Sequence, residues 1–300
     1  MKKGNTILPV YDLWPFNNDN SKLKREVYAA PFAPYLAAHP HFLVPHRHSF
    51  YHMVMFTKGS GVHVIDFEQF SIQKGQLYFM APGQVHTWNF TTPPDGYVVN
   101  FSPGLFSTFL SDIHYLDQFR FFSGIGQESV LQPDIDTFIK AEEILSNVVK
   151  EVQNDSAGAL DMIRSLLLSL FIILSRTTIK NTDKQVPQHN RLVLLNFRKL
   201  VEQYYTEMKL PKEYAAMLYI TPNHLNALCN DVLGKPAGEI IRDRIVLQAK
   251  RLLVNADLQV AEIASQLNFP DNSYFTKFFR KYTGSTPENF RKQTLGSTLN

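Results

Sequence analysis

The stretch that most constrains this chain lies near its C-terminal end, over residues 259–291: QVAEIASQLNFPDNSYFTKFFRKYTGSTPENFR. Apolar residues recur at helical spacing in each half of it, which predicts two short helices. The segment Asn268-Phe269-Pro270-Asp271 is expected to end the first helix, because proline and clusters of polar residues interrupt helices and mark turns. Two short helices joined by a tight turn, the second with an aromatic and a basic-polar face, are typical of a helix-turn-helix. The alternative is a helical hairpin on a solvated surface.

A second copy of the pattern occurs upstream, over residues 210–234. Thr221 suits an N-cap, Pro222 suits the first helical position and Gly234 suits a helix end. Between the copies, apolar periodicity predicts one helix over 236–254, about 25 Å long at the rise of an α-helix. With the width of the helices added, it can hold two recognition helices about one DNA turn apart. The sequence therefore predicts an all-α domain with two helix-turn-helix units.

Residues 191–292 resemble the AraC/XylS family of transcription regulators. The resemblance covers about a hundred residues at fixed spacing. It implies a sequence-specific regulator that binds double-stranded DNA through both units. The matching residues are Ala215, Thr221, Pro222, Leu225, Gly234 and Lys235 in the first unit, and Ile263, Ala264, Phe269, Tyr274, Phe275, Phe278, Gly284, Thr286, Pro287, Phe290 and Arg291 in the second.

The two predicted recognition helices differ in their outward chemistry. The first has Ala227, Asn230 and Asp231 where members of the family often carry Arg or Lys, whereas the second has three cations. We therefore expect an uneven division between base contacts and phosphate contacts. Tyr274 is expected to lie half in the core. The expected base-contacting residues are Asn223, His224, Asn226, Asn272, Ser273 and Thr276, and the expected phosphate-contacting residues are Lys277, Arg280 and Lys281.

Charge and composition agree with this division. From residue 190 onward, 15 Lys/Arg and 10 Asp/Glu leave a net charge of +5, although the whole chain carries only +3. The positive excess therefore lies in the part expected to meet phosphate. The single cysteine, Cys229, excludes an intrachain disulfide and fits a reducing compartment. The N-terminus lacks an apolar signal core, and the most apolar stretch, 166–174, is too short to span a bilayer. We expect a cytoplasmic protein without membrane contact.

The region from about residue 27 to 101 predicts a β-sandwich or barrel. Short runs rich in aromatic and β-branched residues alternate there with Gly and Pro turn signals. Lys58-Gly59-Ser60-Gly61 is expected to be a turn between two strands, as are Lys74-Gly75 and Pro82-Gly83. The predicted strands are 50–57, 61–67, 70–73, 76–80, 85–90 and 97–102.

Histidines gather in two clusters of this region. His46 and His48 can point together, because residues two apart share a face of a strand, and His86 can join them from a neighbouring strand. The region resembles a cupin barrel: these three match its usual metal-ligand positions, and His52 lies where many cupins carry Glu. Many regulator cupins keep such histidines without a metal. We therefore expect no cofactor, and we keep a metal site at His46, His48, His52 and His86 as the alternative. The expected effector-binding residues are His46, His48, His86, Phe50 and Trp88, while His39, His41 and His63 are expected on the surface or exterior of the barrel.

Helices are expected to follow the barrel. The aromatic segment 103–130 is expected to pack on the outside of the barrel, with a lid over it as the alternative. The helix from Ala159 to about Thr177 is apolar over more than one face, so it must bury against more than one surface. We expect the barrel on one face and a second copy of the chain on the other, although the monomer alone could supply both. The expected organisation is a flexible arm (1–25), a cupin-like barrel with its connecting segment (26–130), a helical dimerisation segment (131–178), a linker (179–190) and a DNA-binding domain (191–293).

The expected fold class is multidomain β + α: an N-terminal cupin-like β-barrel followed by helices, and a C-terminal all-α double helix-turn-helix. Its favoured function is a transcription regulator, expected to be an activator, whose docking on DNA changes when a small molecule binds the barrel. The expected partners are double-stranded DNA, that effector, a second copy of the chain and RNA polymerase. One alternative is a metal-dependent cupin enzyme or metal sensor. Another is an architectural DNA-binding protein whose barrel only dimerises. We expect no catalytic activity.

Overall fold

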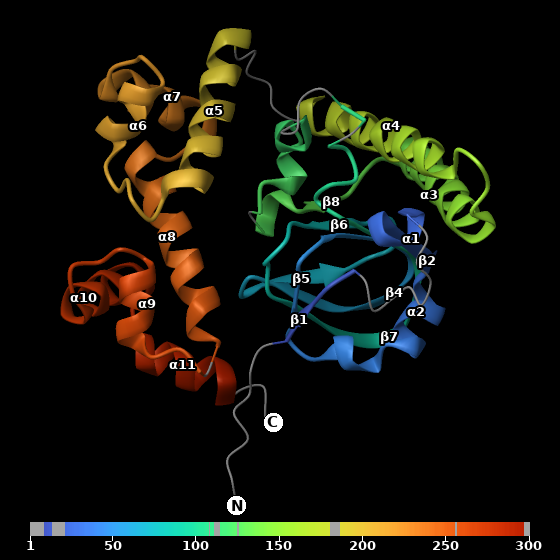
Figure 1. Ribbon diagram of the computed structural model, residues 1–300, viewed down its shortest axis with the longest axis horizontal. Helices are drawn as coiled ribbons and strands as arrows, with labels where there is room; N and C mark the ends of the chain where they lie inside the picture. Colours follow the sequence, from blue (N-terminus) through green and yellow to red (C-terminus); the bar gives the residue numbers. More distant parts are fainter. Residues whose placement is uncertain are drawn as a thin grey trace, which may run out of the picture. The chain divides into compact units, whose positions relative to one another are not determined.

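The chain folds into two compact units, one within residues 9–182 and one within 183–300, and each is described by itself (Figure 1). The computed structural model describes residues 9–13, 22–107, 109–110, 115–124, 126–180, 187–255 and 257–296.

The first unit is built on a six-stranded sheet in the order β2-β7-β4-β6-β8, with β5 paired to β4. A short parallel pair, β1 and β3, lies beside it. Part of the expected arm over 1–25 is therefore structured, because β1 and helix α1 lie in it. The elements are β1 (Val10–Tyr11), α1 (Lys22–Glu26), β2 (Val27–Pro31), α2 (Phe32–Ala38), β3 (Arg47–His48), β4 (Tyr51–Ile65), β5 (Glu68–Ile72), β6 (Leu77–Met80), β7 (His86–Phe101), β8 (Val130–Leu131), α3 (Ile135–Asn154) and α4 (Ala159–Lys180).

The longest pairing is the antiparallel ribbon of β4 and β7, and it corrects one expectation. The segment expected to turn at Gly59 and Gly61 continues as strand, with register shifts against β7 between Phe56 and Gly61. Both glycines have left-handed φ, +107° and +150°, and a Cβ on Gly61 would lie 2.2 Å from the Asn89 carbonyl oxygen. Glycine marks a β-bulge here because β7 passes too close for a side chain.

The bulges change which residues face each side of the sheet. Before them, Met53 and Met55 pack with α3 and α4, while Val54 and Phe56 pack in a second core with Trp88. After them, the odd-numbered Ile65 belongs to that second core. Since strand side chains alternate, the extra residues of the bulges have shifted the alternation by one position.

Helices α3 and α4 form a hairpin on one side of the sheet (Figure 1). Phe171 of α4 contacts the rings of Phe106, Phe119 and Phe122 from the segment that follows β7. In its described residues, that segment therefore packs between α4 and the outer face of the sheet, as expected.

The second unit is entirely helical in its described part. Helix α8 runs between α5, α6 and α7 on one side and α9, α10 and α11 on the other (Figure 1). Arg244 on α8 binds Glu202 of α5 through two contacts of 2.6 and 2.7 Å. None of the described helices in the chain is long and apolar enough to cross a membrane. The helices are α5 (Gln188–Tyr204), α6 (Pro211–Met217), α7 (Pro222–Leu233), α8 (Ala237–Leu253), α9 (Val260–Gln266), α10 (Asn272–Thr283) and α11 (Pro287–Gly296).

Candidate DNA-binding and effector sites

The first helix-turn-helix consists of α6 and α7, and its ends are as the sequence predicts. The Thr221 hydroxyl accepts a hydrogen bond from the His224 backbone N–H at 3.1 Å, and Pro222 occupies the first turn of α7. Gly234 ends α7 with a left-handed φ of 71°. These caps satisfy backbone groups that a helix end leaves unpaired. They fix the two ends of the first recognition helix.

The second helix-turn-helix, which consists of α9 and α10, repeats this construction. The Asp271 carboxylate accepts from the Tyr274 backbone N–H at 2.7 Å, and Gly284 ends α10 with φ 81°. The turns of the two units also match: Tyr219 and Asn268 both have left-handed backbones, with φ 54° and 52°. The chain therefore carries two versions of one helix-turn-helix, joined through α8 (Figure 1).

Most of the residues predicted to contact DNA lie on the surface of α7 and α10. Thr276 is half-buried. Asn226 corrects the prediction: it is half-buried, and its Oδ1 accepts a hydrogen bond from the Ala237 backbone N–H at 3.1 Å. That side chain serves the start of α8 and is not turned outward. The exposed residues are Asn223, His224, Asn272, Ser273, Lys277, Arg280 and Lys281.

Two tyrosines differ from expectation. Tyr274 was expected half in the core, yet its side chain is 58% exposed at the start of α10. Tyr219 was not predicted as a site residue, yet it is 95% exposed in the turn before α7. The sequence gives no signal for this position, because an aromatic residue does not indicate a left-handed turn. Tyr219 lies just before the N-terminal end of α7, and Tyr274 lies in the first turn of α10.

The cations of the two helix-turn-helices also differ in whether a carboxylate of the protein already pairs with them. Among the described residues, no carboxylate forms an ion pair with Lys277, Arg280 or Lys281. Beside the first recognition helix, by contrast, Lys235 is held by Asp243 at 2.7 Å. That bond and the nearby carboxylates raise the pKa of Lys235. Of the cations on or beside the two recognition helices, those of α10 therefore have no carboxylate partner in the described part of the chain.

The predicted effector residues come together inside the first unit. His46, His48, His86, Phe50 and Trp88 are all buried, with side chains 0–3% exposed. The ring of His46 lies 4.2 Å from that of His86 and that of His48 lies 4.4 Å from that of Phe50, centroid to centroid. Strand pairing explains the assembly, because His46 and His86 form a β-bridge.

Two further histidines complete the cluster. His52 is fully buried, and its Nδ1 donates to the Asn100 Oδ1 at 2.6 Å. His63, expected outside the barrel, is also fully buried and lies 3.2 Å from His86 through Nε2 and Nδ1. The bulges in β4 turn His63 inward, as they do Ile65. His41 is exposed and His39 half-buried.

Hydrogen bonds decide which ring nitrogens are available. The His46 Nδ1 donates to the Val44 carbonyl at 2.8 Å, so its Nε2 carries a lone pair. This Nε2 lies 3.1 Å from the Nε2 of His48. Burial lowers the pKa of His46 to about 4 and that of His52 to about 3, so both rings are neutral near neutral pH.

The donor set fits a transition-metal ion. Ring nitrogens of His46, His48 and His86 lie within 4.8 Å of one another. Within the described part of the chain, the Nε2 atoms of His52 and His86 are buried without a hydrogen-bond partner. Neutral imidazole binds zinc, copper, iron and nickel, and a ligating histidine usually donates its other N–H to a second group. His46 and His52 already do so.

Comparison with known proteins places both halves in one family. The AraC-like ligand binding domain model matches residues 32–170, and a helix-turn-helix domain model matches residues 214–293. The chain belongs to the AraC family of transcription regulators. The HTH-type transcriptional activator RhaR of Cronobacter sakazakii is 21% identical over 273 residues, which are 90% of this chain and 95% of that one. The uncharacterized transcriptional regulatory protein YesN of Bacillus subtilis is 31% identical over 114 residues, 37% of this chain and 31% of that one.

A solved structure of ToxT from Vibrio cholerae shares 12% sequence identity over 89% of this chain and 98% of that chain, with a TM-score of 0.42. In the chain described here, the histidine cluster lies in the ligand-binding domain, and the recognition helices α7 and α10 lie in the helix-turn-helix domain.

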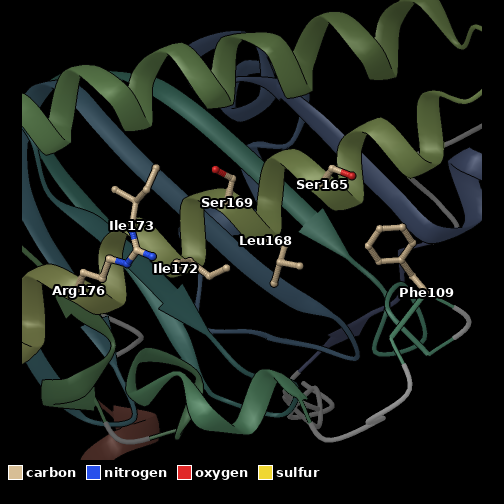
Figure 2. Close-up of a pocket in the computed structure, with 7 residues that line it drawn as sticks. All are labelled: Phe109, Ser165, Leu168, Ser169, Ile172, Ile173 and Arg176. Carbon is tan, nitrogen blue, oxygen red and sulfur yellow. The ribbon is translucent and has the colours of Figure 1, made fainter.

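The ligand-binding domain of this AraC-family chain also carries a surface pocket of about 400 Å³ along α4. Figure 2 shows Phe109 at one end, Arg176 at the other and the side chains of α4 between them. Leu168, Ile172 and Ile173 make its floor apolar. The pocket therefore marks the face of α4 that the sheet does not cover.

Proposed function

We propose that this regulator binds DNA through α7 and α10 together and activates transcription in response to an effector in its N-terminal unit. One observation carries the proposal: two matching helix-turn-helix units flank α8, and each presents polar residues on an exposed recognition helix. Helix α8 has 17 residues, or about 25 Å of axis. Together with the width of the helices, that length suits two recognition helices in successive major grooves. The relative named as an activator supports the sign of regulation.

The two units divide the work. The exposed Asn223 and His224 of α7, and Asn272 and Ser273 of α10, supply donors and acceptors suited to base edges. Lys277 and Arg280 supply charge for phosphates. Binding should therefore be strongly salt-dependent through α10 and much less so through α7.

Selection of bound duplexes from a random pool tests this function. The expected result is a motif with two half-sites about one DNA turn apart. On that duplex, Lys277→Ala and Arg280→Ala should each weaken binding and lower the slope of log affinity against log salt by about 0.9. Lys140→Ala, at an exposed position on α3, is the matched control and should change neither. Failure to enrich any motif, or indifference to both α10 substitutions, would reject the proposal.

The effector is proposed to act at the histidine cluster. A first candidate is a small organic ligand held by His46, His48, His86, Phe50 and Trp88. A second candidate, a transition-metal ion, is favoured by the packing of the cluster. Its side chains are 0–3% exposed, so an organic molecule must displace protein atoms. An ion needs only the ring nitrogens.

Titration of untagged protein with cobalt(II), followed by visible absorption and calorimetry, separates the two candidates. A metal effector predicts one ion per chain and its loss in His48→Ala, while His41→Ala, at an exposed histidine, keeps it. Absence of stoichiometric cobalt binding rejects the ion. Native mass spectrometry that reveals a bound organic molecule, lost in Trp88→Ala, supports the first candidate.

A second copy of the chain is the proposed partner of α4. The inner side of the helix packs on the sheet, while its outer side presents the apolar pocket of Figure 2. Met162 on the same helix is 50% exposed. A dimer would cover this surface and double the DNA contacts of each assembly. RNA polymerase is the further partner that activation requires.

A further inference from the structure

One lysine joins the two helix-turn-helix units at a place away from α8. Lys209 lies just before α6, and its backbone N–H donates to the Glu213 carboxylate at 3.0 Å. Leu210 donates to the same carboxylate at 2.8 Å. The main chain at Lys209 is therefore fixed to the first turn of α6, which belongs to the first helix-turn-helix.

The side chain of Lys209 reaches the second helix-turn-helix. Its ammonium donates to the backbone carbonyl of Asn268, the left-handed residue between α9 and α10. It also lies 4.1 Å from the centroid of the Phe269 ring. A lysine at the C-terminal end of a helix and over an aromatic face is stabilised by both contacts.

Phe269 carries this contact to the second recognition helix. Its ring packs on Phe275 and Phe278 of α10, with centroids 5.3 and 5.0 Å apart. A continuous path therefore runs from the start of α6 through Lys209 and Phe269 to α10. Without that path, the principal connection between the units is α8, and rotation about its axis would change the angle between α7 and α10.

We propose that Lys209 is a positioning residue that fixes the orientation of the second recognition helix relative to the first, and thereby sets the half-site spacing that the regulator prefers. The predicted effect on DNA binding rests on the proposed function, in which α7 and α10 bind DNA together. Its structural part concerns the free protein alone.

The structural part is tested by pulsed electron paramagnetic resonance on full-length protein. Spin labels at Asn230→Cys on α7 and Glu288→Cys on α11 report the distance between the units, and both positions are exposed. Lys209→Met keeps the aliphatic stem but removes the ammonium, and it should broaden the distance distribution. Lys212→Met, at an exposed position three residues along, is the matched control and should not. An unchanged distribution in Lys209→Met overturns the proposal.

The functional part uses duplexes with the selected spacing and with one base pair added or removed. Lys209→Met should lose about fivefold in affinity at the selected spacing, discriminate less among spacings, and keep the wild-type salt slope. Equal loss at every spacing with a salt slope lower by about 0.9 would make Lys209 a phosphate contact and overturn the proposal. If Lys209→Met does not fold, Phe269→Leu replaces it in both measurements. Wild-type binding without a spacing preference would reject two-headed docking, while the distance measurement still decides the role of Lys209.

Discussion

The side-chain Oδ1 of Asn226 accepts a hydrogen bond from the backbone N–H of Ala237 at 3.1 Å. Asn226 belongs to α7, and Ala237 is the first residue of α8. Pro236, which precedes α8, forms no side-chain cap of its own. The recognition helix therefore supplies the missing cap for the helix that connects the two units, which holds α7 against α8.

Asn226→Ala should consequently act on stability. We expect the free energy of unfolding of the C-terminal unit to fall by about 1 kcal/mol, because an amide acceptor at a helix start is lost. Urea denaturation followed by circular dichroism measures this change. The base preference of the selected DNA motif should stay the same. Asn223→Ala is the contrasting variant: it should leave stability unchanged and weaken discrimination at one base pair. A changed motif in Asn226→Ala would restore that residue as a base reader.

Tyr219 and Asn268 occupy matching left-handed positions in the two turns, with φ 54° and 52°. This backbone costs an ordinary side chain about 1–2 kcal/mol, whereas Asn tolerates it. Tyr219→Asn should therefore raise the free energy of unfolding by about 0.5–1 kcal/mol. Asn268→Tyr should lower it by a similar amount. The free energy of unfolding of both variants is measured by urea denaturation without DNA. A higher value for Asn268→Tyr than for the wild type would contradict the prediction that a tyrosine at this left-handed position is unfavourable.

Much of the helical architecture follows from the sequence alone. Thr221, Pro222 and Gly234 predicted both ends of α7, because capping chemistry is local and needs no knowledge of neighbours. Asn226 shows the limit of that reasoning. Helical periodicity placed its side chain on the outward face of α7, whereas the fold brings the N-terminus of α8 within reach of its amide.

The sheet was harder to predict for a related reason. Gly59 and Gly61 signal either a turn or a bulge, and the sequence does not say that β7 passes within van der Waals distance of Gly61. The expected turn does not predict the change of alternation along β4, and His63, which was expected on the surface or exterior of the barrel, is buried. The pairing of His46, His48 and His86 survived, because His46 and His48 share one short strand segment and the three lie away from the bulges.

Cys229 gives a test of packing in the first helix-turn-helix. Its side chain is fully buried, and burial raises the pKa of the thiol to about 11. Because the thiolate is the reactive form, the native protein should react negligibly with Ellman's reagent at pH 8. In urea the same thiol should react stoichiometrically. Rapid modification of the folded protein would show that α7 opens from α8 far more readily than its buried contacts indicate.

The apolar pocket along α4 gives the last prediction. Leu168 and Ile172 lie on its floor, half-buried in the isolated chain. If a second copy packs there, Ile172→Glu places a charge in a dry interface, where an unpaired carboxylate is strongly unfavourable. Wild-type protein should be a dimer by light scattering at micromolar concentration, and Ile172→Glu should be a folded monomer.

Ile135→Glu is the matched control, because Ile135 is 67% exposed at the start of α3 and lies outside the pocket. It introduces the same charge and should leave the dimer intact. DNA binding separates two consequences of dimer loss. Each Ile172→Glu monomer keeps both recognition helices, so affinity for one pair of half-sites should be retained, while affinity for a duplex with two such pairs should fall through lost avidity. A dimer that persists in Ile172→Glu places the interface on another surface.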